Sequence, residues 1–369
     1  MKKVGKKRWL TRAAFMLLGL AAGMVIGEAV LRVLLFSPRI GLNPSSPGAN
    51  HPQYLFMPCP GRGYCLRPFF QGRDQNFYGD FHVPIIINSM AMRSDALEAR
   101  VCGECLRVLM LGDSLTYGEG VSWEEAYPAR AESILNHIPG QRVQVMNGGV
   151  PGYSVSQSFE RLKDCYDRVR PGIVTLAWSP GLFARETVPF TYFNGYLVEG
   201  QALEYARVRG DNIFYTSYAP GSVADKAEMW FQSHSFLYLF LKYDRLRGMI
   251  SLRTLLFLNR MKGGSLKPMT IPPLYLKKPM DTVVEMNRYC SDRGSAFIFI
   301  LLKSGAENEK QILDFCRERG IRAVSLVNFD YLARDTQCLL VFKHDAHFNR
   351  EGHERIARGL APLLAGPAR

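Results

Sequence analysis

The first twelve residues contain no acidic residue, although lysines and arginines are frequent among them. Acidic residues are scarce in the whole chain as well, because 33 of them stand against 46 lysines and arginines, and the formal net charge is +13. The sequence has no motif typical of RNA- or DNA-binding proteins, so we expect no nucleic-acid partner and interpret the charge as a basic surface. Hydrophobic residues make up 47% of the chain, which excludes a disordered protein and is typical of a globular one.

Charged residues are also missing from residues 13–27, directly after the basic tail at residues 1–12. Glu28 and Arg32 follow at a spacing that permits an ion pair on a helix, and the apolar run then continues to Phe36. We expect residues 13–36 to form a transmembrane signal anchor, because they are long enough to cross a bilayer if Glu28 and Arg32 lie near the far interface. A cleaved signal peptide is the alternative, with small residues at Gly27 and Ala29 flanking a cleavage site.

Both interpretations export the rest of the chain. Positive charges before the span predict an N-terminus in the cytoplasm, so residues from about 37 onward are expected outside. The predicted location is therefore the inner (cytoplasmic) membrane, crossed once, with the main domain on the periplasmic or extracellular side.

Three parts are predicted after the span: a connector and lead-in at residues 37–100, a main domain at 101–369, and an insertion within it at about 182–276. In the main domain, short apolar runs alternate with helical patterns, which predicts a parallel sheet covered on both faces. The predicted strands are 108–111, 142–146, 173–178, 296–302 and 323–327. The predicted helices are 123–137, 155–170, 279–293, 307–319 and 350–364. The insertion is too long for a plain crossover, and we interpret it as helical, packing on the sheet; a lid or a helix resting on a bilayer are alternatives.

The cysteines are even in number, eight in all, which agrees with an exported protein. Cys59 and Cys65 flank a turn, and Cys102 and Cys105 lie just before the first strand of the sheet. Each pair could form a disulfide, the two pairs could bridge to one another, or the four thiols could bind zinc. Of the remaining four cysteines, those at 165, 290 and 316 fall in apolar helical patterns and are interpreted as buried thiols; the fourth is Cys338.

The strand at 108–111 ends at Gly112-Asp113-Ser114, where the residue types change to those of turns and helix caps. A serine there lies at the carboxyl end of a buried strand and next to a helix N-terminus, where open α/β sheets bind their ligands. Backbone N–H groups at such a position can stabilise an anion that forms on an attacked substrate.

A serine nucleophile needs a base and the base needs an orienting carboxylate. His347 supplies the imidazole and Asp345, two residues earlier, supplies the carboxylate; both precede the last predicted helix and lie at the same sheet edge as Ser114. Ser179 is a rival nucleophile after the third strand, but Pro180 removes the N–H that would stabilise the anion. Zinc is a second alternative, with candidate ligands at positions 344, 345, 347 and 353, although position 353 falls within a helix. We expect no metal.

Three motifs together resemble a known family. They are Gly112-Asp113-Ser114-Leu115, the segment NGGVPGYS at 147–154, and Asp345-x-His347-x-Asn349-x-x-Gly352-His353. With Asn88-Ser89-x-x-x-Arg93 upstream, they are similar to the GDSL, or SGNH, hydrolases of the membrane-anchored bacterial type. The resemblance covers most of the chain except the connector and the insertion.

The resemblance implies a flavodoxin-like three-layer α/β/α sandwich with about five parallel strands at residues 101–369. It implies Ser114 as nucleophile, His347 as base and Asp345 as the orienting carboxylate, without a cofactor. It also implies an oxyanion hole formed by the N–H groups of Ser114 and Gly152. The family places an asparagine as third donor where this chain has Gly181, which has no side chain; Asn194 is a candidate substitute.

The expected function is a membrane-anchored serine esterase or acyltransferase that works through an acyl-serine. Its expected partners are the membrane, through residues 13–36, and an ester-bearing small molecule, polysaccharide or lipid of the cell envelope. The missing asparagine at position 181 favours an alternative, which is a non-catalytic binding or assembly protein of the envelope that keeps the fold.

Overall fold

The computed structural model describes most of the main domain and parts of the rest. The described residues are 2–33, 55–75, 80–179, 185–186, 189–193, 196–199, 207–209, 212–214, single positions and a short stretch between 223 and 241, 273–304, 306–328, 340–342, 345 and 347–365.

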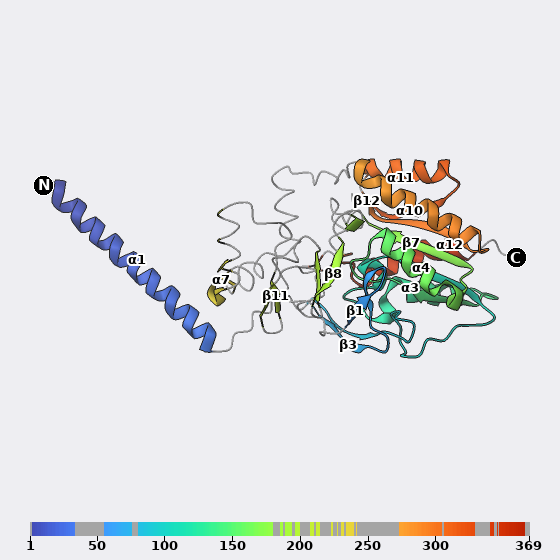
Figure 1. Cartoon of the computed structure of the whole chain (residues 1–369), viewed down its shortest axis with the longest axis horizontal. Coiled ribbons are helices and arrows are strands. Elements are labelled where there is room, and N and C mark those ends of the chain that lie inside the picture. The colour runs from blue at the N-terminus through green and yellow to red at the C-terminus, as the bar shows by residue number, and fades with distance from the viewer. Residues whose placement is uncertain are drawn as a thin grey trace.

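The centre of the main domain is a parallel five-stranded sheet, as the sequence predicts (Figure 1). Its strands are β5 (Leu106–Leu111), β6 (Val143–Asn147), β7 (Ile173–Trp178), β12 (Ala296–Ser304) and β13 (Arg322–Asn328), in the spatial order β13-β12-β7-β5-β6. The chain runs from β5 outward to β6 and then returns to the other side of β5 with β7. The strand order therefore reverses beside β5, and in open α/β sheets ligands bind at the carboxyl ends of the strands at that point.

Helices cover both faces of this sheet, which makes three layers. Buried side chains of α3 (Tyr127–Asn136) and α12 (Arg350–Leu364) pack on one face. Those of α4 (Val155–Val169), α10 (Pro273–Ser291) and α11 (Ala306–Glu318) pack on the other. Since each strand meets a helix layer above and below, near-continuous apolar strands are required, and this explains why their composition could be recognised.

Two helix boundaries differ from the sequence prediction. The helix predicted at 123–137 is divided into a 3₁₀ turn (Trp123–Glu125) and α3, because Ala126 between them is extended. Pro128 then occupies the first turn of α3, where its missing N–H costs no hydrogen bond. The helix predicted to begin at Pro279 begins at Pro273 instead, so Pro279 lies inside α10.

The lead-in is more ordered than a connector. Residues 55–75 and 80–88 contain two antiparallel hairpins, β1 (Phe56–Cys59) with β2 (Gly63–Leu66), and β3 (Gln71–Gln75) with β4 (His82–Ile86). Their apolar side chains form a third core with Tyr117, Val150 and Tyr153 of the main domain. The pattern FHVPIIIN at residues 81–88 predicts a strand or extended segment where β4 lies, but the other three strands are not predicted.

The insertion is only partly described. It contains the hairpins β8 (Phe190–Phe193) with β9 (Tyr196–Glu199) and β10 (Arg207–Arg209) with β11 (Asn212–Phe214), as well as the short helix α7 (Phe236–Leu239). Phe190 and Leu197 are buried in the third core, so this part of the insertion packs on the lead-in. The described part of the insertion thus includes strands beside its short helix.

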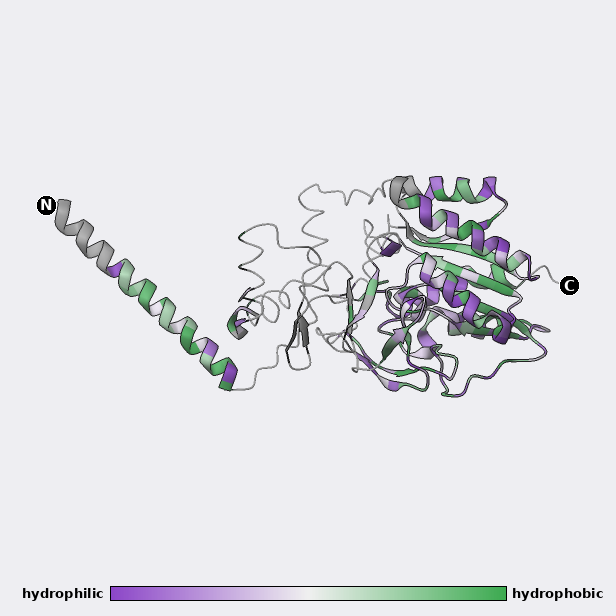
Figure 2. Cartoon of the chain, viewed as in Figure 1, coloured by the Kyte–Doolittle hydropathy of each residue, from purple (hydrophilic) through white to green (hydrophobic). Residues whose placement is uncertain are grey.

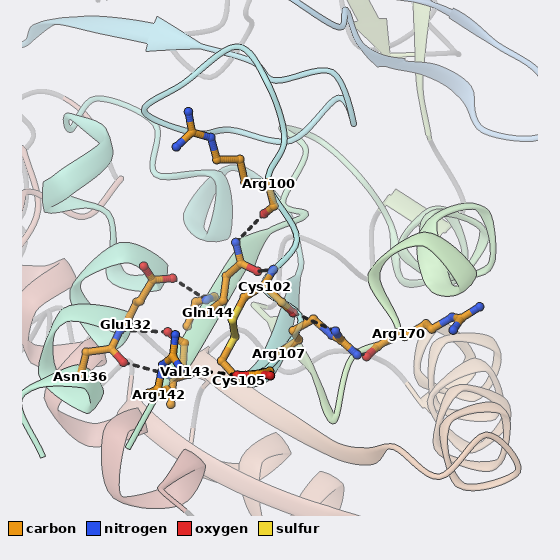
Figure 3. The surroundings of a disulfide bond; sticks show 12 residues. Arg100, Cys102, Cys105, Arg107, Glu132, Asn136, Arg142, Val143, Gln144 and Arg170 are labelled. Carbon is orange, nitrogen blue, oxygen red and sulfur yellow. Dashed lines mark hydrogen bonds and ion pairs between the residues drawn. A yellow bond between two sulfur atoms is a disulfide. The ribbon is translucent and has the colours of Figure 1, made fainter. Parts of the chain in front are cut away.

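One disulfide joins Cys102 and Cys105, and Cys59 and Cys65 are free thiols. The predicted disulfide between Cys102 and Cys105 is therefore confirmed. The structure shows neither a bridge between Cys59 and Cys65, nor a bridge between the two pairs, nor a zinc site formed by these four cysteines. Figure 3 shows how the disulfide loop is fastened to the edge strand β6: the side chain of Gln144 accepts the N–H of Cys102 and donates to the carbonyl of Arg100. The thiols of Cys165, Cys290 and Cys316 are buried, as predicted.

The N-terminal helix α1 (Lys2–Val33) contains one stretch that is long and apolar enough to cross a membrane or to act as a signal sequence, Arg12–Val33, of 22 residues with a mean hydropathy of 2.1. Figure 2 shows this apolar character along α1, outside the main domain. Glu28 and Arg32 form the expected ion pair at 2.8 Å. The carboxylate of Glu28 also accepts the hydroxyl of Ser235 at 2.9 Å and the N–H of Leu237 at 2.8 Å.

Candidate active site

Three side chains predicted to act together lie in one hydrogen-bonded row. His347 Nε2 lies 2.8 Å from Ser114 Oγ, and His347 Nδ1 lies 2.6 Å from Asp345 Oδ1. Asp345 and His347 are 3% and 7% exposed, whereas Ser114 is only partly buried, so the carboxylate is shielded while the serine can be reached. Since Asp345 is a carboxylate acceptor, it favours the tautomer with the proton on Nδ1, which leaves Nε2 to accept the hydroxyl of Ser114.

The turn that carries Ser114 follows from its sequence. Asp113 is the N-cap of α2 (Ser114–Tyr117), and its carboxylate accepts the N–H of Leu115 at 3.0 Å. Ser114 is therefore the first residue of a short helix, where backbone N–H groups have no acceptor within the helix. Gly112 lies so close to Ala177 and Thr116 that a Cβ at this position would be 2.2 Å from Thr116 Oγ1. Gly112 thus permits the close approach to Ala177 and Thr116, Asp113 caps α2, and Ser114 presents a partly exposed hydroxyl.

Two buried polar side chains hold the loop behind Ser114 in place. The guanidinium of Arg93 donates to the carbonyls of Tyr117, Gly118 and Val121. The amide of Asn147 donates to the carbonyls of Thr116 and Tyr117. The upstream motif, through Arg93, and the second motif, through Asn147, therefore support this loop. Asn88 holds its own turn, because its side-chain oxygen accepts the N–H groups of Met90 and Met92.

The third motif is explained residue by residue. Asp345 Oδ1 accepts the backbone N–H of His347 at 2.8 Å as well as its ring, so the carboxylate fixes both the main chain and the imidazole. Asn349 caps α12 by accepting the N–H of Gly352 at 3.1 Å. A Cβ at Gly352 would lie 2.4 Å from the carbonyl oxygen of Leu340, which only glycine avoids. His353 is buried and accepts the N–H of Tyr127 at 3.2 Å, so it supports the start of α3 and not a metal.

The structure also bears on the two alternatives, which are Ser179 as the nucleophile and a zinc site. The hydrogen bond of His347 goes to Ser114, while Ser179 follows β7 and is 8% exposed. Among the described residues, no group of three histidine, cysteine, aspartate or glutamate side chains is placed to hold a metal ion. His344 lies outside the described residues.

The turn at Gly152 carries one of the two N–H groups predicted to form the oxyanion hole. Gly152 has a φ of 77°, a conformation that favours glycine, and a Cβ there would be 2.4 Å from a ring carbon of Phe190. The hydroxyl of Tyr64 donates to the carbonyl of Pro151 at 2.9 Å, so the lead-in and the insertion both close around this turn. Gly181 and Asn194 lie outside the described residues.

A second carboxyl group near His347 was not predicted. Glu119 is 3% exposed, and its Oε2 lies 3.5 Å from His347 Nε2. Burial, more than the nearby Asp74, raises the pKa of Glu119 to about 8, although His347 acts in the opposite direction. Asp74 comes from the lead-in strand β3 and accepts the N–H of Gly120 at 3.0 Å. The sequence offers one signal for Glu119, which is its position between two glycines and five residues after Ser114. No local pattern in the sequence indicates that its side chain is buried.

Comparisons with known proteins give matches among solved structures, at low similarity and over part of the chain. No family model matches the chain, and no curated protein matches its sequence. Among solved structures, the chain is similar to TesA, with 9% identity and a TM-score of 0.37 over 70% of this chain and 98% of TesA. It is also similar to AlinE4, an SGNH-hydrolase family esterase (15%, 0.35, 72% of this chain and 100% of AlinE4), and to a lipase/acylhydrolase from Enterococcus faecalis (12%, 0.38, 71% and 96%).

Proposed function

We propose that this chain is a serine ester hydrolase of the GDSL/SGNH type, anchored in a membrane through α1. The observation that carries the proposal is the row Ser114–His347–Asp345, with 2.8 Å and 2.6 Å between its polar atoms, at the carboxyl end of β5 where the strand order reverses. A serine, a base and an orienting carboxylate in this geometry are the requirements of acyl transfer through a serine.

The reaction follows from the tautomer that Asp345 selects. Nε2 of His347 takes the hydroxyl proton of Ser114 while Oγ forms a bond to the ester carbonyl carbon. The imidazolium then gives this proton to the alcohol oxygen as the ester bond breaks, which leaves an acyl-serine. Water, or another hydroxyl acceptor, attacks the acyl-serine in the same way and releases Ser114. The N–H groups of Ser114 and Gly152 are the proposed donors to the oxyanion.

The membrane part of the proposal is supported by two features of α1. Its apolar stretch is long enough to span a bilayer. Glu28, near the end of that stretch, forms an ion pair with Arg32 and accepts hydrogen bonds from Ser235 and Leu237. A carboxylate with an ion-pair partner and hydrogen-bond donors fits the polar interface at the end of a span. We propose that the catalytic domain lies outside the cytoplasm, where an envelope ester (small molecule, polysaccharide or lipid) is the proposed substrate.

The test is hydrolysis of p-nitrophenyl acetate by the full chain in detergent micelles, with Ser114→Ala as the matched control. We expect wild-type turnover above that of Ser114→Ala at every pH between 6 and 9. Equal rates for the two proteins, both folded by circular dichroism, would end the proposal for this substrate class.

A non-catalytic envelope protein with the same fold is the second candidate, because Gly181 cannot supply the side-chain donor that the resemblance expects. Loss of one such donor costs about 10²–10³ in rate. This candidate predicts that Ser114→Ala changes no rate and no probe labelling, whereas the enzyme proposal predicts a low but serine-dependent rate.

A further inference from the structure

Glu119 is a buried carboxyl group that the reaction above does not use. Its Oε2 has no hydrogen-bond partner among the described residues, and it lies 3.5 Å from Nε2 of His347, the atom that must accept the proton of Ser114. An unpartnered buried carboxyl oxygen is costly, so its position beside the reacting nitrogen calls for a physical reason.

The charges that face Glu119 come from several elements. Asp74 lies on β3, Asp113 precedes α2, and Asp345 and His347 lie on the segment before α12. The three carboxylates and the burial disfavour a negative charge on Glu119, while His347 favours it. The balance leaves Glu119 largely protonated at neutral pH.

The two charge states of Glu119 have opposite effects on His347. A carboxylate 3.5 Å from Nε2 attracts a proton to that nitrogen, and a protonated Nε2 cannot accept the proton of Ser114. A neutral carboxyl group leaves the lone pair of Nε2 to accept the hydroxyl of Ser114. Once the proton of Ser114 has moved to Nε2, an oxygen of the neutral carboxyl group is within reach of the new N–H.

We propose that Glu119 is a positioning residue that keeps His347 competent as a base: it holds its own proton while Ser114 is deprotonated, and then accepts a hydrogen bond from the imidazolium. The proton that moves is that of Ser114, which goes to Nε2, and the proton of Glu119 stays where it is. This inference rests on the proposed function.

The test is the pH dependence of kcat for wild type, Glu119→Gln and Asp74→Asn, with the exposed Glu124→Gln as the matched control. For wild type we expect an alkaline loss of activity with a midpoint near pH 8, because ionised Glu119 retains a proton on Nε2 and opposes the charge of the oxyanion. Glu119→Gln should lower kcat at pH 7 by up to about tenfold, through competition of its amide for Nε2, and should abolish the alkaline loss. Asp74→Asn, which keeps an acceptor for Gly120, should move the loss to lower pH, because a neighbouring negative charge is removed.

A second readout does not depend on turnover. In ¹⁵N-histidine NMR spectra of the full chain, the His347 Nε2 signal should show a step near pH 8 in wild type and in Glu124→Gln, and none in Glu119→Gln. The same His347 titration in wild type and Glu119→Gln overturns the inference. If Ser114→Ala is as active as wild type but the step is still specific to Glu119, the proposed function fails and the coupling of the two side chains stands.

Discussion

Replacing Asp345 by asparagine removes the charge that orients His347 while it preserves the shape of the side chain. One oxygen of Asp345 accepts two hydrogen bonds, from the ring Nδ1–H at 2.6 Å and from the backbone N–H of His347 at 2.8 Å. Hydrogen bonds to charged groups contribute about 1.5–3 kcal/mol each. An asparagine whose NH₂ group takes the place of Oδ1 loses both, which would raise the barrier by about 3–6 kcal/mol, or about 10²–10⁴ in rate at about 1.4 kcal/mol per tenfold change. An amide NH₂ facing Nδ1 also favours the tautomer with the proton on Nε2, which cannot act as base.

The assay is kcat on p-nitrophenyl acetate for the full chain in micelles, and Asp113→Asn is the matched control. Asp113 is also a carboxylate near Ser114, but its role is to cap α2, and asparagine caps a helix equally well. We expect less than a tenfold loss for Asp113→Asn and at least a hundredfold loss for Asp345→Asn. Asp345→Asn within tenfold of wild type, or equal losses in the two variants, would refute the orienting role.

Three further predictions concern the supports of the site. Gly152 and Gly140 both have a φ near 80°, but only a Cβ at Gly152 would meet a neighbour, Phe190, within 4 Å. Thermal unfolding should therefore show a larger loss of stability for Gly152→Ala than for Gly140→Ala. Similar losses of stability would count against the close packing. His353→Phe should lower the free energy of unfolding by about 1–3 kcal/mol, because the N–H of Tyr127 loses its acceptor, with the specific activity of folded protein within about twofold; a hundredfold drop would mean that His353 serves the chemistry. The double variant Cys102→Ser, Cys105→Ser should lower the free energy of unfolding, measured with denaturant, by about 2 kcal/mol or less, because the disulfide closes only a short loop. If reduction of the wild-type protein leaves its free energy of unfolding unchanged, the disulfide is contradicted.

Much of the sheet could be predicted because its strands are buried on both sides. All five appear in the sequence as short apolar runs, and Ser114, Asp345 and His347 stand at the ends of elements that a parallel sheet brings to one edge. The lead-in hairpins were not predicted, because β1 to β3 are only four or five residues long and each contains a proline or a glycine. Their order comes from packing against Tyr117 and Tyr153, contacts that are distant in sequence.

The same reason explains what was missed around the site. Arg93 stands out in the sequence as part of the upstream motif, but its role becomes visible only with its carbonyl partners on the loop after Ser114. Glu119 and Asp74 are acidic residues in turn-like or polar stretches, and only the folded chain buries both near His347. Long-range burial of charged groups has no local pattern in the sequence, whereas caps and close-approach glycines do.

The most direct measurement of the central claim is covalent labelling of the full chain with a fluorophosphonate probe, followed by peptide mapping. The proposed function predicts one modified serine, Ser114, with labelling lost in Ser114→Ala and slowed at least a hundredfold in Asp345→Asn. Folded wild-type protein that remains unlabelled, or that is labelled at Ser179 instead, would contradict the assignment of Ser114 as the nucleophile.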